Sequence, residues 1–322
     1  MTVTLALAGD TMLGRGVAYL LAKSADPGAY VSDGVRAYLA EADLTLLNLE
    51  CCLSDRGDPW PEPGKIFHFR APPRAADLLA RLGVHCVMLA NNHALDYGHE
   101  ALLDTCDHLA AAGIRTAGAG PDLARAREPV VLDVRGLRLS VISVTDHPAD
   151  YAATPHRPGV AHADLPSGVP SWLTDTVARA RAETDAVLVS PHWGPNMTTA
   201  PQPYIRAAAT VLAGAGATLI AGHSAHVPHG VAPPVLYDLG DFLDDYAVDP
   251  GLRNDLSLLF LVTIDELGPV RLRAVPLKLD YCRTVLAHGE ERAWLGRRFI
   301  AACADLGTTA AWEDGLLAAD LR

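Results

Sequence analysis

Several polar residues stand where short apolar segments of the sequence end, and their types match the ligands of a divalent metal. The apolar segments 3–8, 44–49, 86–89, 186–190 and 218–221 are predicted to be strands. Ligands of open α/β sheets bind just beyond the carboxyl ends of the strands, so these side chains are expected at one rim. Carboxylate, imidazole and carboxamide groups together suit Mn²⁺, Zn²⁺ or Fe²⁺. The candidates are Asp10, Asn48, Glu50, Asn91, Asn92, His93, His192, His223 and His226.

Each of these residues also has a simpler explanation when it is taken alone. Asp10 could be a helix cap or a turn residue. The pair Asn91 and Asn92 suits a turn, because Asn tolerates left-handed backbone angles. His192 could be a hydrogen-bonded histidine of the core. The coincidence of five strand ends, rather than any one residue, therefore predicts the metal site.

The segments that must position these residues alternate between strand and helix patterns. Helical patterns occur at 16–23, 35–41, 75–82, 100–112, 172–183 and 204–212, and a hairpin is predicted from 130–134 and 137–144. Strand patterns then dominate at 235–239, 256–264 and 270–279, before a last helix at 292–306. This order predicts a layered α/β sandwich with mixed sheets. The irregular stretches 54–64 and 146–168 are expected to wall a substrate cleft, and Phe67–Arg70 to form a half-buried strand.

Composition limits the partners and the compartment of the protein. The 322 residues carry a formal net charge of −12, which disfavours nucleic acid and anionic membranes because both are polyanions. The longest uncharged stretch, 207–222, is shorter than the roughly 20 residues that span a bilayer. The six cysteines are scattered and are expected to be reduced thiols. A soluble, cytoplasmic protein without nucleic-acid or membrane partners is therefore expected.

The order of the short motifs resembles one known family. The residues that carry the resemblance are Gly9-Asp10-Thr11-Met12-Leu13-Gly14-Arg15, Asn48-Leu49-Glu50, Ala90-Asn91-Asn92-His93-Ala94-Leu95-Asp96-Tyr97-Gly98, His192-Trp193-Gly194, Gly222-His223-Ser224-Ala225-His226 and Leu239-Gly240-Asp241-Phe242. This series is similar to the CapA family of poly-γ-glutamate capsule biosynthesis proteins, within the calcineurin-like metallophosphoesterase superfamily. The similarity runs from about Thr4 to about Leu279.

The resemblance implies a four-layer αββα sandwich with a two-metal site at its strand ends. On the matching positions it implies metal ligands at Asp10, Glu50, Asn92, His192, His223 and His226, with Glu50 as the acid that bridges the metals. His93 would face the substrate, and His93 with Asp96 would form the catalytic pair. Asp96 and Asp241 would also orient histidines. Residues 1–280 are expected to form this domain, and 281–322 a helical extension packed on it.

Two positions depart from the superfamily pattern. Met12 stands where a histidine ligand usually follows the first aspartate, and a thioether is a poor ligand for a hard cation. Ser224 stands where many relatives have a third histidine. His229 could compensate, or could be a surface residue. The cofactor is accordingly expected to be one or two divalent ions of Mn, Fe or Zn.

The expected function is that of a metal-dependent hydrolase. A metal-activated water would cleave a phosphate ester, with a γ-glutamyl-like amide as the nearest competitor. The substrate is expected to be a small-molecule or oligomeric anion, with Arg15, His68 and Arg70 as candidates to bind it and Asp146-His147 as a further candidate lining of the cleft. Two alternatives stay open: an accessory role in making an anionic polymer, and a tailoring step in a small-molecule pathway.

Overall fold

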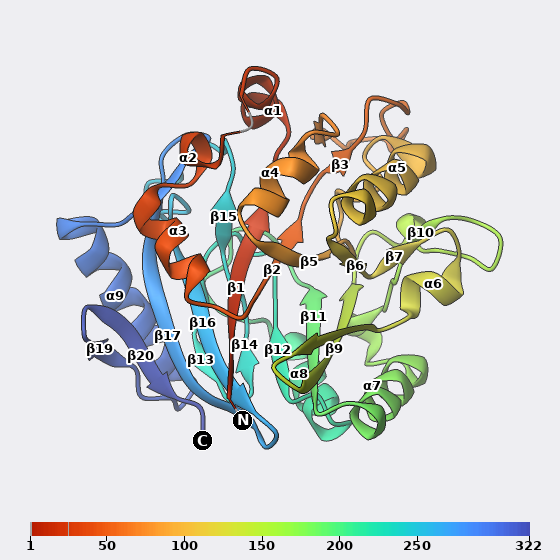
Figure 1. Ribbon diagram of the computed structural model, residues 1–322. Helices are drawn as coiled ribbons and strands as arrows, with labels where there is room; N and C mark the ends of the chain where they lie inside the picture. Colours follow the sequence, from red (N-terminus) through yellow and green to blue (C-terminus); the bar gives the residue numbers. More distant parts are fainter. Residues whose placement is uncertain (1, 25) are drawn as a thin grey trace.

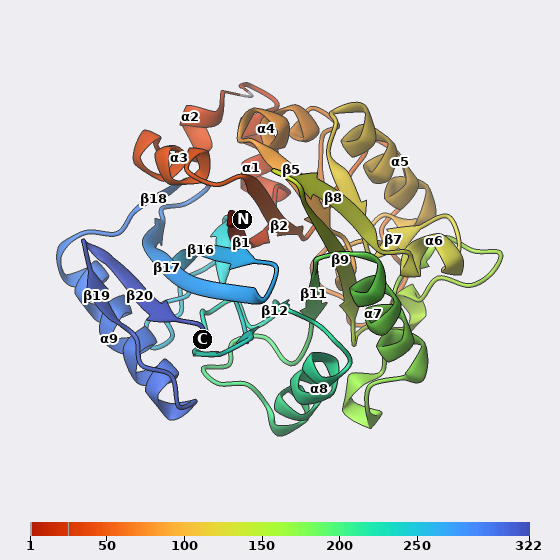
Figure 2. The same cartoon turned by 60° about the horizontal axis from the view of Figure 1, so that its bottom comes forward.

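The computed structural model describes residues 2–24 and 26–322. Within these residues the strands form two large mixed sheets that face each other, and helices cover the outer face of each sheet (Figures 1 and 2). The order of layers is helix, sheet, sheet, helix. The expected αββα sandwich is thus confirmed.

The larger sheet has β1 near its centre. β1 runs parallel to β2 and β15 and antiparallel to β16. The order along the sheet is β19-β20-β17-β16-β1-β2-β5-β6, with β15 added beside β1 and β18 beside β17. These strands are β1 (Val3–Thr11), β2 (Leu44–Leu49), β5 (Val84–Met88), β6 (Arg115–Ala117), β15 (Asp241–Leu243), β16 (Leu256–Asp265), β17 (Gly268–Leu279), β18 (Thr284–Leu286), β19 (Ala311–Glu313) and β20 (Leu316–Asp320).

The second sheet has the order β13-β14-β12-β11-β9-β8. β9, β11, β12 and β14 are parallel neighbours, and β8 pairs antiparallel with β9 in the expected hairpin. Its strands are β8 (Val130–Val134), β9 (Leu137–Thr145), β11 (Ala186–His192), β12 (Leu219–Ala221), β13 (Val231–Ala232) and β14 (Val235–Leu236). Two small pairs stand apart: β3 (Cys52–Leu53) with β4 (Arg70–Ala71), and β7 (Ala119–Gly120) with β10 (Gly159–Val160).

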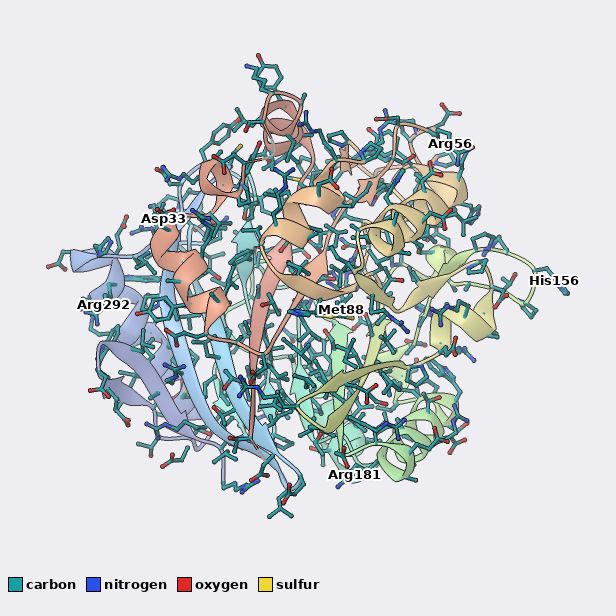
Figure 3. The ribbon with its side chains drawn as sticks, in the orientation of Figure 1. Asp33, Arg56, Met88, His156, Arg181 and Arg292 are labelled. Carbon is teal, nitrogen blue, oxygen red and sulfur yellow. The ribbon has the colours of Figure 1, made fainter. Side chains whose placement is uncertain are left out.

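The alternation of side chains along β1 shows how one strand serves two cores. Leu5 and Leu7 point into the core between the sheets, whereas Ala6 and Ala8 point to the core under the outer helices. Met88 lies in the central core, and Arg56 and His156 lie at the periphery (Figure 3). The larger sheet is covered by α1 (Arg15–Leu21), α2 (Pro27–Tyr30), α3 (Asp33–Ala40), α4 (Ala75–Arg81) and α5 (Gly98–Ala111), and the second sheet by α7 (Ser171–Glu183) and α8 (Pro203–Gly214). The short helices are α6 (Leu123–Arg127), η1 (Ala149–Tyr151) and η2 (Leu165–Ser167).

The C-terminal residues contain more than the helix that was expected. α9 (Gly289–Asp305) packs on β16, β17 and β13, and its Leu295 and Phe299 enter the core between the sheets. After α9 the chain adds β19 and β20, and β20 pairs with β17. These strands escaped the sequence analysis because they are short, and the three residues of β19 are all exposed. Residues 281–322 therefore extend the large sheet as well as covering it.

The expected strand at Phe67–Arg70 is wrong except at its end. Only Arg70 and Ala71 pair as a strand, because Ile66 and Phe67 are 82% and 54% exposed and have no sheet to join. No helix among the described residues is long and apolar enough to cross a lipid bilayer.

Candidate metal centre

Three side chains from different strands form the first candidate metal-binding group. Asp10 lies near the end of β1, Glu50 directly follows β2, and His192 ends β11 of the second sheet. Each is at most 1% exposed, and their ligand atoms lie within 4.8 Å of one another. The group therefore joins the two sheets at the carboxyl ends of their parallel strands, where ligands of α/β folds bind.

A second group shares Asp10 with the first and adds His226 and Asp241. Asp241 begins β15 and is the direct partner of Asp10 in the parallel pairing of β15 with β1. Asp10 is thus common to both groups, whereas Glu50 belongs to one. The bridging role expected of Glu50 stays a prediction.

Several ligand atoms around these groups are buried and make no hydrogen bond. Glu50 Oε1 lies 3.3 Å from His192 Nε2, yet the two atoms form no hydrogen bond. Unpartnered buried polar atoms are costly in a folded protein, so their convergence calls for a partner such as a cation. The unpartnered atoms are Glu50 Oε1 and Oε2, His192 Nε2, His223 Nε2, Asn92 Oδ1 and Asp241 Oδ2. The donor set of carboxylates, imidazoles and a carboxamide fits a divalent metal.

Hydrogen bonds to carboxylates fix which ring nitrogens are free to bind. An ionised carboxylate only accepts, so the 2.9 Å contact from His223 to Asp10 requires Nδ1–H on His223. His226 Nδ1 lies 2.8 Å from Asp241 Oδ1, and burial of this histidine is outweighed by the charges of Glu50 and Asp10, which raise its pKa. In the neutral ring of His223 the unpartnered Nε2 then carries the lone pair, which is the form that metals bind.

Two asparagine side chains form hydrogen bonds that connect the residues of this centre. Asn48 donates to Asp10 Oδ1 at 2.8 Å, and its Nδ2 lies 3.3 Å from His192 Nδ1. Asn91 donates to Asn48 Oδ1 at 3.0 Å and accepts the backbone N–H of His93. Of the expected asparagine pair, the side chain of Asn91 is therefore used in these bonds, whereas the side-chain oxygen Oδ1 of Asn92 has no hydrogen-bond partner.

Burial and mutual repulsion set the charges of the centre. Burial and then the charge of Asp10 raise the pKa of Glu50 well above its ordinary value. Burial and then Asp244 raise the pKa of Asp241 well above its ordinary value too. Burial acts the same way on Asp10, but the hydrogen bond and charge of His223 outweigh it and hold its pKa below the ordinary value. Burial lowers the pKa of His192, which keeps the ring neutral. A cation would relieve the repulsion among the carboxylates.

His93 and Asp96 form a pair next to the centre, as expected. His93 Nδ1 lies 2.7 Å from Asp96 Oδ2, and the ring packs on Phe69 with centroids 4.3 Å apart. Burial lowers the pKa of His93 although Asp96 opposes the shift. Asp96 also accepts the backbone N–H of Phe69 at 2.6 Å. The pair leaves Nε2 of His93 as the ring nitrogen that can exchange a proton.

Lys65 is a residue of this site that sequence reasoning missed. Its Nζ lies 2.9 Å from Asp96 Oδ1 and 2.9 Å from the carbonyl oxygen of Asn92, and the side chain is 11% exposed. Tyr151 donates to the same Asp96 oxygen at 3.1 Å. No periodicity or motif marks Lys65, because it lies in an irregular stretch, 27 residues from Asn92 along the chain.

The residues expected to bind substrate have other contacts. Arg15 bonds Asp245 and lies 5.1 Å from the ring centre of Phe69, which itself packs on His93. His68 contacts the carbonyl oxygen of Trp60 at 3.0 Å. Arg70 donates to the carbonyls of Arg56 and Gly57 and stacks on Tyr97. Arg15 is thus beside the site, whereas the described contacts of His68 and Arg70 lie on the loop around residues 56–60 and on the ring of Tyr97.

Met12 and Ser224, the two residues that depart from the superfamily pattern, make local hydrogen bonds. The buried sulfur of Met12 accepts the backbone N–H of Gly14 at 3.0 Å. Ser224 has a positive φ of 110°. Its hydroxyl donates to Gly194 O, and its backbone N–H donates to Asp10 Oδ2. His229 is 3% exposed and contacts Thr198 O through Nε2, so it is buried rather than on the surface.

Asp146 and His147 reach the site from the end of β9. Asp146 Oδ2 accepts the backbone N–H of Gly194 at 3.1 Å and the hydroxyl of Tyr204 at 2.8 Å. The ring of His147 is centred 5.4 Å from that of His192. This strand end therefore lines the centre beside His192.

The four-layer sandwich and its strand-end groups define an αββα protein with a candidate metal centre between its two sheets. The sequence model described as bacterial capsule synthesis protein PGA_cap matches residues 4–246. The chain therefore belongs to this capsule synthesis family, which confirms the resemblance to CapA. It is 32% identical to a "probable polyglutamine synthesis accessory protein" of Mycobacterium tuberculosis, over 91% of this chain and 89% of that one.

One further relative agrees with this assignment, and one solved structure shares the fold. A "capsule biosynthesis protein CapA" of Bacillus anthracis is 28% identical over 86% of this chain and 68% of its own length. A solved structure described as a "putative 5'-nucleotidase" from Staphylococcus aureus superposes with a TM-score of 0.50 and 12% identity, over 92% of this chain and 58% of that one. At that identity the likeness concerns the fold.

Proposed function

We propose that the protein is a metal-dependent hydrolase whose centre is built on Asp10. The observation that carries this proposal is the set of buried, unpartnered ligand atoms of Glu50, His192, His223 and Asp241 around that residue. Divalent ions bound there supply the Lewis acidity that polarises a phosphoryl or carbonyl group. In this proposal the two groups, which share Asp10, bind one or two ions.

The chain's own residues would handle the proton. Asp96 accepts Nδ1–H of His93 and so fixes the tautomer in which Nε2 takes up or returns a proton. Lys65 and Tyr151 hold Asp96 in place. Arg15 lies 5.1 Å from the centre of the Phe69 ring, which packs on His93.

Two bonds fit such a site, and the relatives favour one of them. A phosphate ester suits the fold, whereas a γ-glutamyl amide suits the polyglutamine and capsule synthesis named for the relatives. The same polarisation stabilises the oxyanion formed from either group. The test is metal analysis combined with hydrolysis of a p-nitrophenyl phosphate ester and of a γ-glutamyl p-nitroanilide. A protein that holds no Mn, Fe or Zn and gains no activity from them contradicts the proposal.

The printed names of the relatives also favour a second function, an accessory role in synthesis of an anionic polymer. The two functions predict different behaviour of site variants. Asp10→Asn and His93→Ala should each abolish hydrolysis, whereas a purely accessory role would survive both changes in a folded protein. Polymer yield in cells that carry each variant distinguishes the two.

A further inference from the structure

A hollow of about 420 Å³ lies between α9 and two loops, and no residue of the metal centre lines it. Its walls are Thr199, Gly251, Trp294, Arg297 and Arg298. Four of these five residues lie beyond the part of the chain that the family model matches, residues 4–246. The hollow is therefore formed largely by this chain's C-terminal portion.

Among residues 2–24 and 26–322, two arginines and no acidic residue line the hollow. Arg298 donates Nη1 to the carbonyl of Leu252, and its Nη2 is buried without a hydrogen-bond partner. The guanidinium carbon of Arg298 lies 5.4 Å from the centre of the Trp294 ring. Arg297 is exposed and makes no ion pair among the residues that the structure describes. The exposed guanidinium of Arg297 is therefore the group suited to binding a carboxylate.

The nearby acidic groups are occupied elsewhere. Arg253 and Lys278 pair with Asp255 and Glu291, so these four residues balance one another. Asp249 Oδ1 accepts the backbone N–H groups of Gly251 and Leu252, which belong to the same loop. The lining of the hollow thus carries two arginines on a protein of net charge −12.

Both loops of the hollow begin at the metal centre. Thr199 lies in the segment that follows His192, and this segment is tied to the centre by the 3.0 Å bond from Met197 N to Ala225 O. Gly251 lies in the segment that follows β15, whose first residue is Asp241.

We propose that this hollow binds a second carboxylate of an extended γ-linked glutamate chain, at a distance from the bond placed at the metal centre. The inference rests on the proposed function and on its γ-glutamyl form. Each γ-linked unit carries one free carboxylate, so a chain of several units can engage the centre and the arginines together. Trp294 provides an apolar surface for the methylene groups between carboxylates.

The test measures binding of a fluorescein-labelled γ-linked glutamate hexamer by anisotropy, in a His93→Ala background that prevents turnover. Arg297→Gln should weaken hexamer binding about tenfold, the effect of losing one charge-assisted contact, and Arg297→Lys should restore part of it. The loss should shrink in high salt. The matched control is Arg115→Gln, an exposed arginine on β6 at the opposite edge of the large sheet.

A second measurement separates this inference from the proposed function. Hydrolysis of a single γ-glutamyl p-nitroanilide, too short to reach the hollow, should be unchanged in Arg297→Gln. If that substrate is cleaved but the hexamer binds Arg297→Gln and wild type equally, the inference is overturned while the hydrolase stands. If nothing is cleaved yet hexamer binding depends on Arg297, the hollow holds and the hydrolase proposal fails.

Discussion

Glu50 is a buried carboxylate with two unpartnered oxygens, so its replacement should weaken metal binding without destabilising the metal-free protein. Because burial raises the pKa of Glu50, its charge is unfavourable in the metal-free protein. We expect Glu50→Gln to weaken metal binding by at least about 10–100-fold, while the metal-free variant melts no lower than wild type. Metal titration and thermal melting with and without chelator measure both effects.

The control for this variant is Asp104→Asn. Asp104 is also buried but bonds Ser54 and Arg56, away from the two groups. The Asp104→Asn substitution should lower the melting temperature and leave metal affinity unchanged. A Glu50→Gln protein with normal metal content and rate would refute the role of Glu50 as a ligand.

Asp10 and Asp241 should differ in how many ions they affect. Asp10 belongs to both candidate groups, whereas Asp241 belongs only to the group with His226. Asp10→Asn is therefore expected to reduce binding of all ions, and Asp241→Asn to remove one ion and keep the group of Asp10, Glu50 and His192. Stoichiometry from Mn²⁺ titration decides this. Equal loss in both variants would mean that the centre holds one ion.

The sequence predicts residues at strand ends better than residues that arrive from loops. Asp10, Glu50 and His192 converge because parallel strands end at one edge, which can be inferred from apolar segments alone. Lys65 cannot be found in this way, because its loop follows no repeating pattern. Asp241 contacts a histidine as expected, but its place in a candidate metal-binding group was not predicted, because the short strand β15 that pairs it with Asp10 is not visible in the sequence.

At the scale of elements, the loop between β3 and β4 connects the surface to the pair of His93 and Asp96. Lys65 supplies this connection through Asp96 and the carbonyl of Asn92. We expect Lys65→Met to lower kcat/KM by about 10–100-fold, because a buried carboxylate loses its charged partner. Lys65→Arg should recover part of the rate, and metal content should not change.

The comparison variant for the same loop is Arg70→Met, whose contacts lie on the carbonyls of Arg56 and Gly57 and on Tyr97. If Arg70→Met lowers the rate as much as Lys65→Met, the loop acts through its general shape. If only Lys65→Met does so, the ion pair to Asp96 carries the effect. Steady-state rates on a phosphate ester and a γ-glutamyl amide measure this.

At the scale of the whole molecule, the C-terminal residues are part of the core rather than an addition to it. Phe299 of α9 is 1% exposed in the core between the sheets. We expect Phe299→Ala to lower the free energy of unfolding by about 3–5 kcal/mol, a large share of a typical total. Removing residues 281–322 should prevent folding, because β17 would lose β20 and the core would lose α9. Urea unfolding and circular dichroism measure these effects, and a folded truncated protein would contradict them.

The same C-terminal helix is joined to the sheet by charges, which predicts how stability depends on pH. Burial raises the pKa of Asp255, but hydrogen bonds from Arg253 and Lys278 outweigh it and hold the pKa below its ordinary value. An acid whose pKa is lowered by folding stabilises the protein above the unfolded value, about 3.9, and loses that contribution as the pH falls through the folded value. We expect Asp255→Asn to cost about 1–2 kcal/mol at pH 7, because one partner in each pair is partly exposed. The difference between variant and wild type should shrink below about pH 4. Chemical unfolding of both proteins from pH 3 to pH 7 measures this, and a difference that is constant over that range would mean that packing rather than charge holds α9 at this point.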